Sequence, residues 1–307
     1  MMTRTQRRGR LAALAGALAV TITAAGCSSA SPGLALADQQ AVTAYMAAQF
    51  DGAFKKLDQE LIKPRDEKST VFWHGRFNER KTDKEIDVFR YQAADKAKPE
   101  PPAIFTKSRT SKDMKDNLDQ YHPSGSEWDY LLLGERFRSL ATTPWVRFPT
   151  FTPKDGFNVC LLTGVQTVCA MQDAMKATQK SSPAGLVKEY RQQADGTAEL
   201  LTGVTLKSFV DARVLSFPED FKKQMTPPML ESFLRTTVTM DPQGQLKKIE
   251  INGIVDKGGP KIEIQVGYEI LGKATAKDFP PEPSPLDRTD LPDLNARKDF
   301  FNRLAAL

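Results

Sequence analysis

The stretch KIEIQVGYEI, residues Lys261–Ile270, alternates without a break between apolar and polar side chains. Its apolar members lie on one side of an extended chain, and they are Ile262, Ile264, Val266, Tyr268 and Ile270. A strand with one buried face and one solvent-exposed face is typical of an antiparallel sheet. Two more strands are predicted before it, at 235–240 and 246–255, bounded by the turn sequences DPQG (241–244) and DKGGP (256–260).

Segments further upstream add helices to this sheet, so the sequence predicts an α+β fold. From Asp38 onward, apolar residues recur at three- and four-residue spacing, as on one face of a helix that ends before Pro64. Strands are predicted at 70–80, 84–91, 128–133 and 144–148, with a strand pair at 196–217. Helices are predicted at 166–180, at 181–190 and from 226 to 233, the last two opening on Ser-Pro and Thr-Pro sequences.

The remaining segments set the predicted domain organisation. A polar stretch at 93–127 is too long for a hairpin loop, and we interpret it as an insertion or mobile flap in which His122 is solvated. The folded domain spans 38–285 and ends at a proline-rich exit. Residues 286–307 form a C-terminal tail that is predicted to hold a short docking helix, with the apolar residues Leu294, Phe300, Phe301 and Leu304.

The first 26 residues have the layout of a secretory signal peptide. Basic residues precede an apolar run from Leu11 to Ile22, and Ala24-Ala25-Gly26 then lead into Cys27, an arrangement that resembles a bacterial lipobox. We expect a lipoprotein signal peptide at 1–26, acyl chains on Cys27 and a flexible tether at 27–37, which would hold the domain on the extracytoplasmic face of the cell membrane. The alternatives are ordinary signal-peptidase cleavage and an uncleaved anchor helix.

Net charge, cysteine spacing and the motifs present limit the classes of function that we expect for this chain. Removal of the four leader arginines lowers the formal charge from +5 to about +1, so a nucleic-acid partner is not expected. Cys160 and Cys169 are too far apart for a redox CxxC pair, and a local disulfide is predicted for an oxidising compartment, with two buried thiols as the alternative. No nucleophile elbow, phosphate loop or zinc-protease motif occurs, and His74 and His122 are far apart, so we expect neither an enzyme nor a metal site or cofactor.

Several fragments, taken in order, resemble the actinobacterial lipoproteins of the LppX/LprG type, which share the half-barrel of the lipoprotein carrier LolA. They are PWVRF (144–148), SSPAGLVKEY (181–190), GVTLKSFVDARV (203–214), VTMDPQGQLKKIEI (238–251) and GYEILGKATAKDFPPEP (267–283). The resemblance implies a strongly curved antiparallel sheet, helices over its concave face and an apolar cavity between them. It also implies that the protein binds or carries a membrane lipid or lipoglycan.

The inward side chains of the last strands are the candidate lining of that cavity: Ile249, Ile251, Ile262, Ile264, Val266 and Tyr268. The same alternation would equally supply a filled core, and the sequence does not distinguish the two. The alternative function is therefore a non-catalytic interaction or sensor module of the cell envelope with a protein partner.

Overall fold

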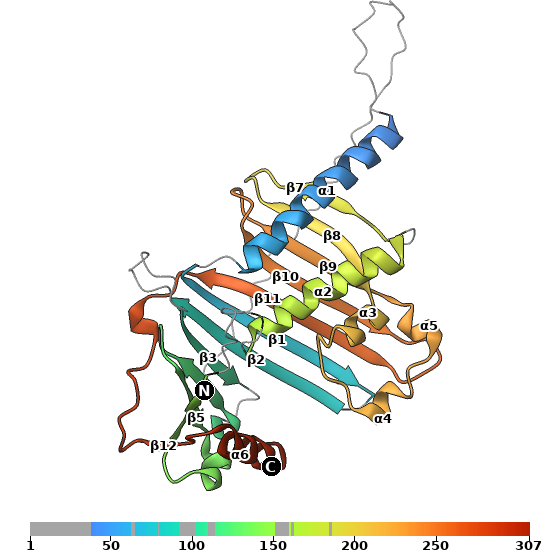
Figure 1. Cartoon of the computed structure of the whole chain (residues 1–307). Coiled ribbons are helices and arrows are strands. Elements are labelled where there is room, and N and C mark those ends of the chain that lie inside the picture. The colour runs from blue at the N-terminus through green and yellow to red at the C-terminus, as the bar shows by residue number, and fades with distance from the viewer. Residues whose placement is uncertain are drawn as a thin grey trace, which may run out of the picture. The chain divides into compact units, whose positions relative to one another are not determined.

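The computed structural model describes residues 38–62, 65–78, 80–91, 102–109, 114–150, 160, 163–183 and 186–307. The helices in this part of the chain are α1 (Gln39–Ile62), α2 (Val165–Ser181), α3 (Leu206–Asp211), α4 (Glu219–Lys222), α5 (Pro227–Leu230) and α6 (Leu294–Ala305). The strands are β1 (Glu67–Phe77), β2 (Arg80–Tyr91), β3 (Ala103–Arg109), β4 (Leu118–His122), β5 (Trp128–Leu133), β6 (Trp145–Pro149), β7 (Glu189–Gln192), β8 (Ala198–Thr205), β9 (Phe233–Met240), β10 (Leu246–Val255), β11 (Ile262–Gly272) and β12 (Arg288–Asp290) (Figure 1).

These strands form one large, curved, unclosed sheet. Its order across the described strands is β12-β6-β5-β4-β3-β2-β1-β11-β10-β9-β8-β7, and every neighbouring pair is antiparallel except β12 with β6. Strand β11 lies between β10 and β1 near the centre of the sheet, where Val266 is paired with Ile251 on one side and with Trp73 on the other. The prediction of an α+β fold built on an antiparallel sheet is confirmed.

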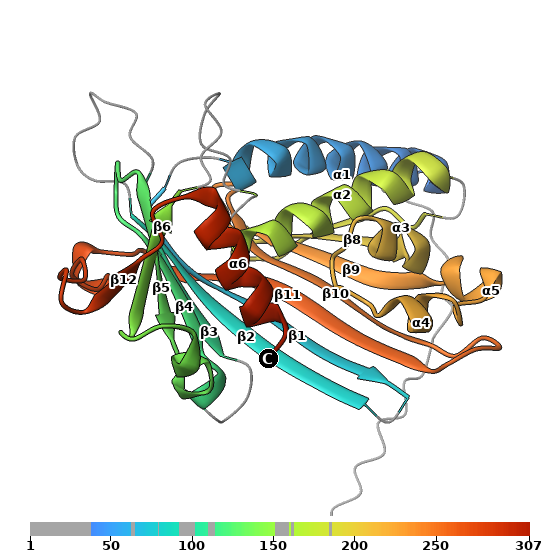
Figure 2. The same ribbon diagram turned by 60° about the horizontal axis from the view of Figure 1, so that its bottom comes forward.

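One face of the sheet carries the main hydrophobic core. Helices α1 and α2 cross the half of the sheet that holds β8–β11 and β1, and the sheet curves around the face that carries them (Figure 2). Phe50, Phe54, Leu57 and Leu61 of α1 are buried here, as are Val168, Met171 and Met175 of α2. Their three- and four-residue spacing produces the apolar stripe that the sequence predicts.

A second hydrophobic cluster anchors the C-terminal helix. Phe300 of α6 is fully buried among Leu131 and Leu133 of β5 and Val146 and Phe148 of β6. The strand registers place these four sheet residues on the same face as Ile86 and Val88 of β2, so α6 shares that face with α1 and α2. The docking helix predicted in the tail is confirmed, and the tail belongs to the same compact unit, residues 39–307.

Three local predictions are wrong. The stretch 93–127 is not simply a loop, because it supplies β3 and β4 to the sheet. The helix predicted at 181–190 is not found in the described part of that segment, since α2 ends at Ser181, residues 186–188 are not helical and β7 begins at Glu189. The strand pair predicted at 196–217 stops at Thr205, whose hydroxyl accepts a hydrogen bond from the Ser208 amide at 3.1 Å and caps α3.

The predicted disulfide is present, and the predicted leader lies outside the described residues. Cys160 and Cys169 are bonded, with Cα atoms 5.8 Å apart. The signal peptide (1–26), the acylation site Cys27 and the tether (27–37) belong to the part of the chain that the structure does not describe. No helix in the described part of the chain has the length and hydrophobicity that crossing a bilayer requires.

Candidate functional site

A large groove lies on the core face at the far end of the β1–β2 hairpin. Its volume is about 1350 Å³, and it is partly open to solvent. The walls come from the end of β1, the start of β2, the first turn of α2, the segment 212–218 and α4 with the turn after it. Its main lining residues are Trp73, Gly75, Phe77, Arg80, Thr82, Lys84, Gln166, Thr167, Ala170, Arg213, Val214, Leu215, Asp220, Phe221 and Gln224.

A glycine allows α2 to start close to the sheet and form one wall. Gly164 precedes the helix with φ +86°, a backbone conformation that side-chain-bearing residues rarely adopt. A Cβ atom built on it would lie 2.7 Å from a methyl carbon of Val88 on β2. The approach therefore requires glycine, and it brings Gln166, Thr167 and Ala170 to the groove.

Aromatic rings form the apolar side of the groove. The ring of Phe77 meets that of Phe221 edge-on at a centroid distance of 5.3 Å, and it meets the buried ring of Phe217 in the same way at 5.1 Å. Phe217 and Phe221 are stacked at 5.9 Å. This packing fixes α4 against the end of β1, so the apolar wall is pre-formed.

Cationic side chains line the same groove. Arg80, Lys84 and Arg213 contribute three positive charges, against one carboxylate, Asp220. The Lys84 ammonium lies 5.2 Å from the centre of the Trp73 ring, and burial lowers the pKa of Lys84 below its ordinary value. An anion placed beside this ammonium would stabilise its charged form. The groove thus combines apolar walls with an excess of positive charge.

Arg213 has an uncommon backbone conformation. It follows the end of α3 with φ +56°, and the next amide, that of Val214, donates to the carbonyl of Phe209 at 3.2 Å. Helices commonly end in this way, but the left-handed residue is usually glycine. An arginine there costs roughly 1–2 kcal/mol in backbone strain. Such strain is often retained at functional sites, where the side chain matters more than the backbone.

The six residues predicted to line a ligand cavity lie elsewhere. Ile249, Ile251, Ile262, Ile264, Val266 and Tyr268 are all at most 4% exposed and belong to the main hydrophobic core. None of them lines the groove. Their inward direction agrees with the alternation in the sequence, and the side chains packed around them place all six in a filled part of the core.

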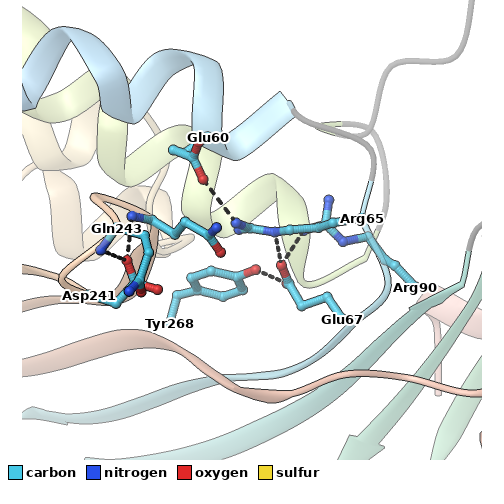
Figure 3. Close-up of polar contacts among 8 residues, drawn as sticks. Glu60, Arg65, Glu67, Arg90, Asp241, Gln243 and Tyr268 are labelled. Carbon is cyan, nitrogen blue, oxygen red and sulfur yellow. Dashed lines mark hydrogen bonds and ion pairs between the residues drawn. The ribbon is translucent and has the colours of Figure 1, made fainter.

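Tyr268 also belongs to a buried ionic network that joins α1 to the sheet (Figure 3). Glu67 at the start of β1 accepts from the Tyr268 hydroxyl, from Arg65 and from Arg90, the last at 2.7 Å. Arg65 also reaches Glu60 of α1 at 3.3 Å. Burial alone would raise the pKa of Glu67, but Arg90 and Arg65 lower it below its ordinary value. Burial and the neighbouring Glu67 raise the pKa of Tyr268 to about 12.

His122 is buried, and the prediction that it is solvated is wrong. Its side chain is 3% exposed, and its Nδ1 atom lies 3.0 Å from Oδ1 of Asp129 on β5. Burial lowers the pKa of Arg297 of α6, and the carboxylate of Asp129 opposes that shift. No sequence motif marks this pair, because the two residues meet only through the β4–β5 pairing.

The opposite face of the sheet carries an aromatic cluster around Phe105, Tyr121 and Tyr130, whereas near the β1–β2 turn the same face is polar. A shallower recess of about 480 Å³ lies there, lined by His74, Arg76, Asp83, Asn252 and Gln265 among others. The exposed His74 has its Nδ1 atom 3.1 Å from Asp83. Within the described residues, no group of three or more His, Cys, Asp and Glu side chains could hold a metal ion.

Comparison with known proteins identifies no family. No family model matches the chain, and no curated protein matches it. One similar solved structure is a DUF1329 family protein from Desulfovibrio piger ATCC 29098, with 9% sequence identity and a TM-score of 0.22. The match covers 76% of this chain and 95% of that chain. A likeness at this level carries no argument about fold or function.

Proposed function

We propose that this protein is a membrane-anchored extracytoplasmic lipoprotein that binds an anionic lipid or lipoglycan in the groove beside its core. The observation that carries the proposal is the groove itself, at about 1350 Å³ with aromatic walls and three cations. Ligand pockets for small molecules typically enclose roughly 300–1,000 Å³, so this groove has room for acyl chains. The sheet and its helices would then form a LolA-like half-barrel, as the resemblance to the LppX/LprG type implies. The proposal includes no bond chemistry.

The two kinds of lining residue suit an amphipathic ligand. Apolar chains laid against Phe77 and Phe221 would leave water and gain dispersion contacts with pre-positioned rings. An anionic headgroup could meet Lys84 and Arg213. A purely apolar ligand would use the first surface and leave the cations without a role.

Mass spectrometry on the organic extract of the protein purified from membranes tests the proposal. We expect a bound lipid in the native chain and its loss in Phe221→Glu, which places a carboxylate in the apolar wall. The matched control is Ile254→Glu, a position that is 68% exposed and outside the groove, where the lipid should be retained. Urea unfolding of both variants shows that each is folded. A native protein that extracts without lipid would overturn the proposal.

The second candidate is an interaction or sensor module without a lipid ligand. The observation in its favour is the filled core, because the six inward residues predicted for a cavity are all buried in the main hydrophobic cluster. A carrier whose cavity lay beneath the middle of the sheet would leave that space open. Crosslinking followed by purification distinguishes the two, since this module should yield one stoichiometric envelope protein and no lipid.

A further inference from the structure

Helix α1 changes character halfway along its length. From Phe50 onward its apolar residues are buried, with Phe50 and Leu57 fully covered. Before Phe50 the helix is largely exposed, and Val42 and Tyr45 are 44% and 62% accessible. Figure 1 shows the reason, because the N-terminal half of α1 extends past β7, the last strand on that side of the sheet.

The exposed half has no charged side chain. Residues 39–50 read QQAVTAYMAAQF, with no Asp, Glu, Lys or Arg. Ala41, Tyr45 and Ala48 share one exposed stripe at four- and three-residue spacing, and Val42 lies beside it. A helix that projects into water normally carries charges on its outer face. This half instead presents a neutral, weakly apolar surface that includes Tyr45, and tyrosine is a side chain suited to a membrane–water interface.

We propose that the N-terminal half of α1 lies in the headgroup region of the bilayer to which the protein is anchored. The inference rests on the anchoring part of the proposed function. The helix begins twelve residues after Cys27, a length of chain that spans at most about 40 Å when fully extended. Acyl chains on Cys27 would therefore keep this surface close to the lipid headgroups.

The tether explains why a small, weakly apolar surface can be sufficient for contact with the membrane. A free peptide with one valine, one tyrosine and a few alanines on its exposed face would bind a bilayer only weakly. A short tether raises the effective concentration of the second site to about the millimolar range, so a weak contact becomes occupied. The contact would hold α1 at the membrane and fix the orientation of the domain relative to the bilayer.

Depth-dependent quenching tests the contact on the full chain as processed by a bacterial host. An environment-sensitive fluorophore is placed on Ala41→Cys, and the protein is reconstituted into vesicles of phosphatidylethanolamine and phosphatidylglycerol that carry a quencher on the lipid. We expect strong lipid quenching at residue 41. The double change Val42→Glu/Tyr45→Glu should reduce it several-fold, whereas Leu286→Glu, at a position 91% exposed on the C-terminal side, should not.

Each other outcome overturns the proposal in a distinguishable way. Intact mass of the reconstituted protein reports acylation of Cys27 independently, and an unmodified cysteine would overturn the anchoring and this contact together. An acylated protein whose residue 41 is quenched from the aqueous phase alone would overturn the contact and leave the anchor intact. Protection of residue 41 from both quenchers, with a doubled mass in light scattering in detergent, would assign this surface to a second copy of the chain.

Discussion

Glu67 is the residue on which the junction between α1 and the sheet depends most. Its carboxylate is 1% exposed and is paired with Arg65 and Arg90. Removing one partner from a buried ion pair typically costs about 3–5 kcal/mol, because the remaining charges stay buried. We expect Glu67→Gln to lower the free energy of unfolding by about this amount in urea denaturation. Glu263→Gln, at a solvent-exposed pair with Lys261, should have little effect on the free energy of unfolding.

The same carboxylate predicts that the protein loses stability at acidic pH. Its pKa in the folded state is lower than in the unfolded chain, so its contribution is present above the unfolded value of about 4.3 and is lost as the pH falls through the folded value. The difference in unfolding free energy between the native chain and Glu67→Gln should therefore shrink progressively below about pH 4. A difference that stayed constant from pH 7 to pH 3 would contradict the assignment.

At Arg213 we expect opposite effects on stability and on ligand binding, because its backbone conformation is strained and its side chain supplies a groove cation. Glycine tolerates φ +56° without strain, so Arg213→Gly should raise the free energy of unfolding by about 1 kcal/mol. The same change removes one of the groove cations and should weaken the binding of a fluorescent phosphatidylglycerol. Arg213→Lys keeps both the strain and the charge and serves as the control. A glycine variant that binds like the native chain would show that Arg213 has no part in the site.

At the level of elements, α6 predicts that the C-terminal tail contributes to stability. Phe300 is fully buried against β5 and β6, and truncation of a buried Phe to Ala typically costs about 3–5 kcal/mol. Phe300→Ala should also increase amide hydrogen exchange across α6 while β1 stays protected. Leu294, in the first turn of the same helix, is 67% exposed, and Leu294→Ala should have little effect on either measurement. Equal effects of the two changes would mean that α6 is not docked through Phe300.

The elements that the sequence predicts well are those with apolar residues on their inward face. Strands β5 and β10 begin and end at the predicted residues, 128–133 and 246–255. Strands β3 and β4 were missed because their inward positions are partly polar: Thr106 and Ser108 on β3, Gln120 and His122 on β4. The alternation that reveals a half-buried strand is absent there, although these strands still pair with their neighbours.

At the scale of the whole molecule, the groove shows why the sequence does not predict this site. Its walls come from segments around residues 73–84, 166–170 and 212–224, and no local motif joins them. The sequence correctly predicts which side chains of β10 and β11 point inward, but whether that space is filled depends on how α1 and α2 pack. The packing of these helices closes the middle of the sheet and leaves the open volume at the end of the β1–β2 hairpin.

Lys84, which lines this open volume, allows a test of whether the ligand is anionic. Its ammonium lines the groove and lies over the Trp73 ring, and a cation near an anionic lipid contributes about 1 kcal/mol, or roughly fivefold in affinity. We expect Lys84→Met to weaken the binding of fluorescent phosphatidylglycerol by about that factor and to leave phosphatidylcholine binding unchanged. Lys207→Met, an exposed change outside the groove, should alter neither. An equal loss for both lipids would mean that Lys84 supports the shape of the groove, because a headgroup contact discriminates by charge and a wall contact does not.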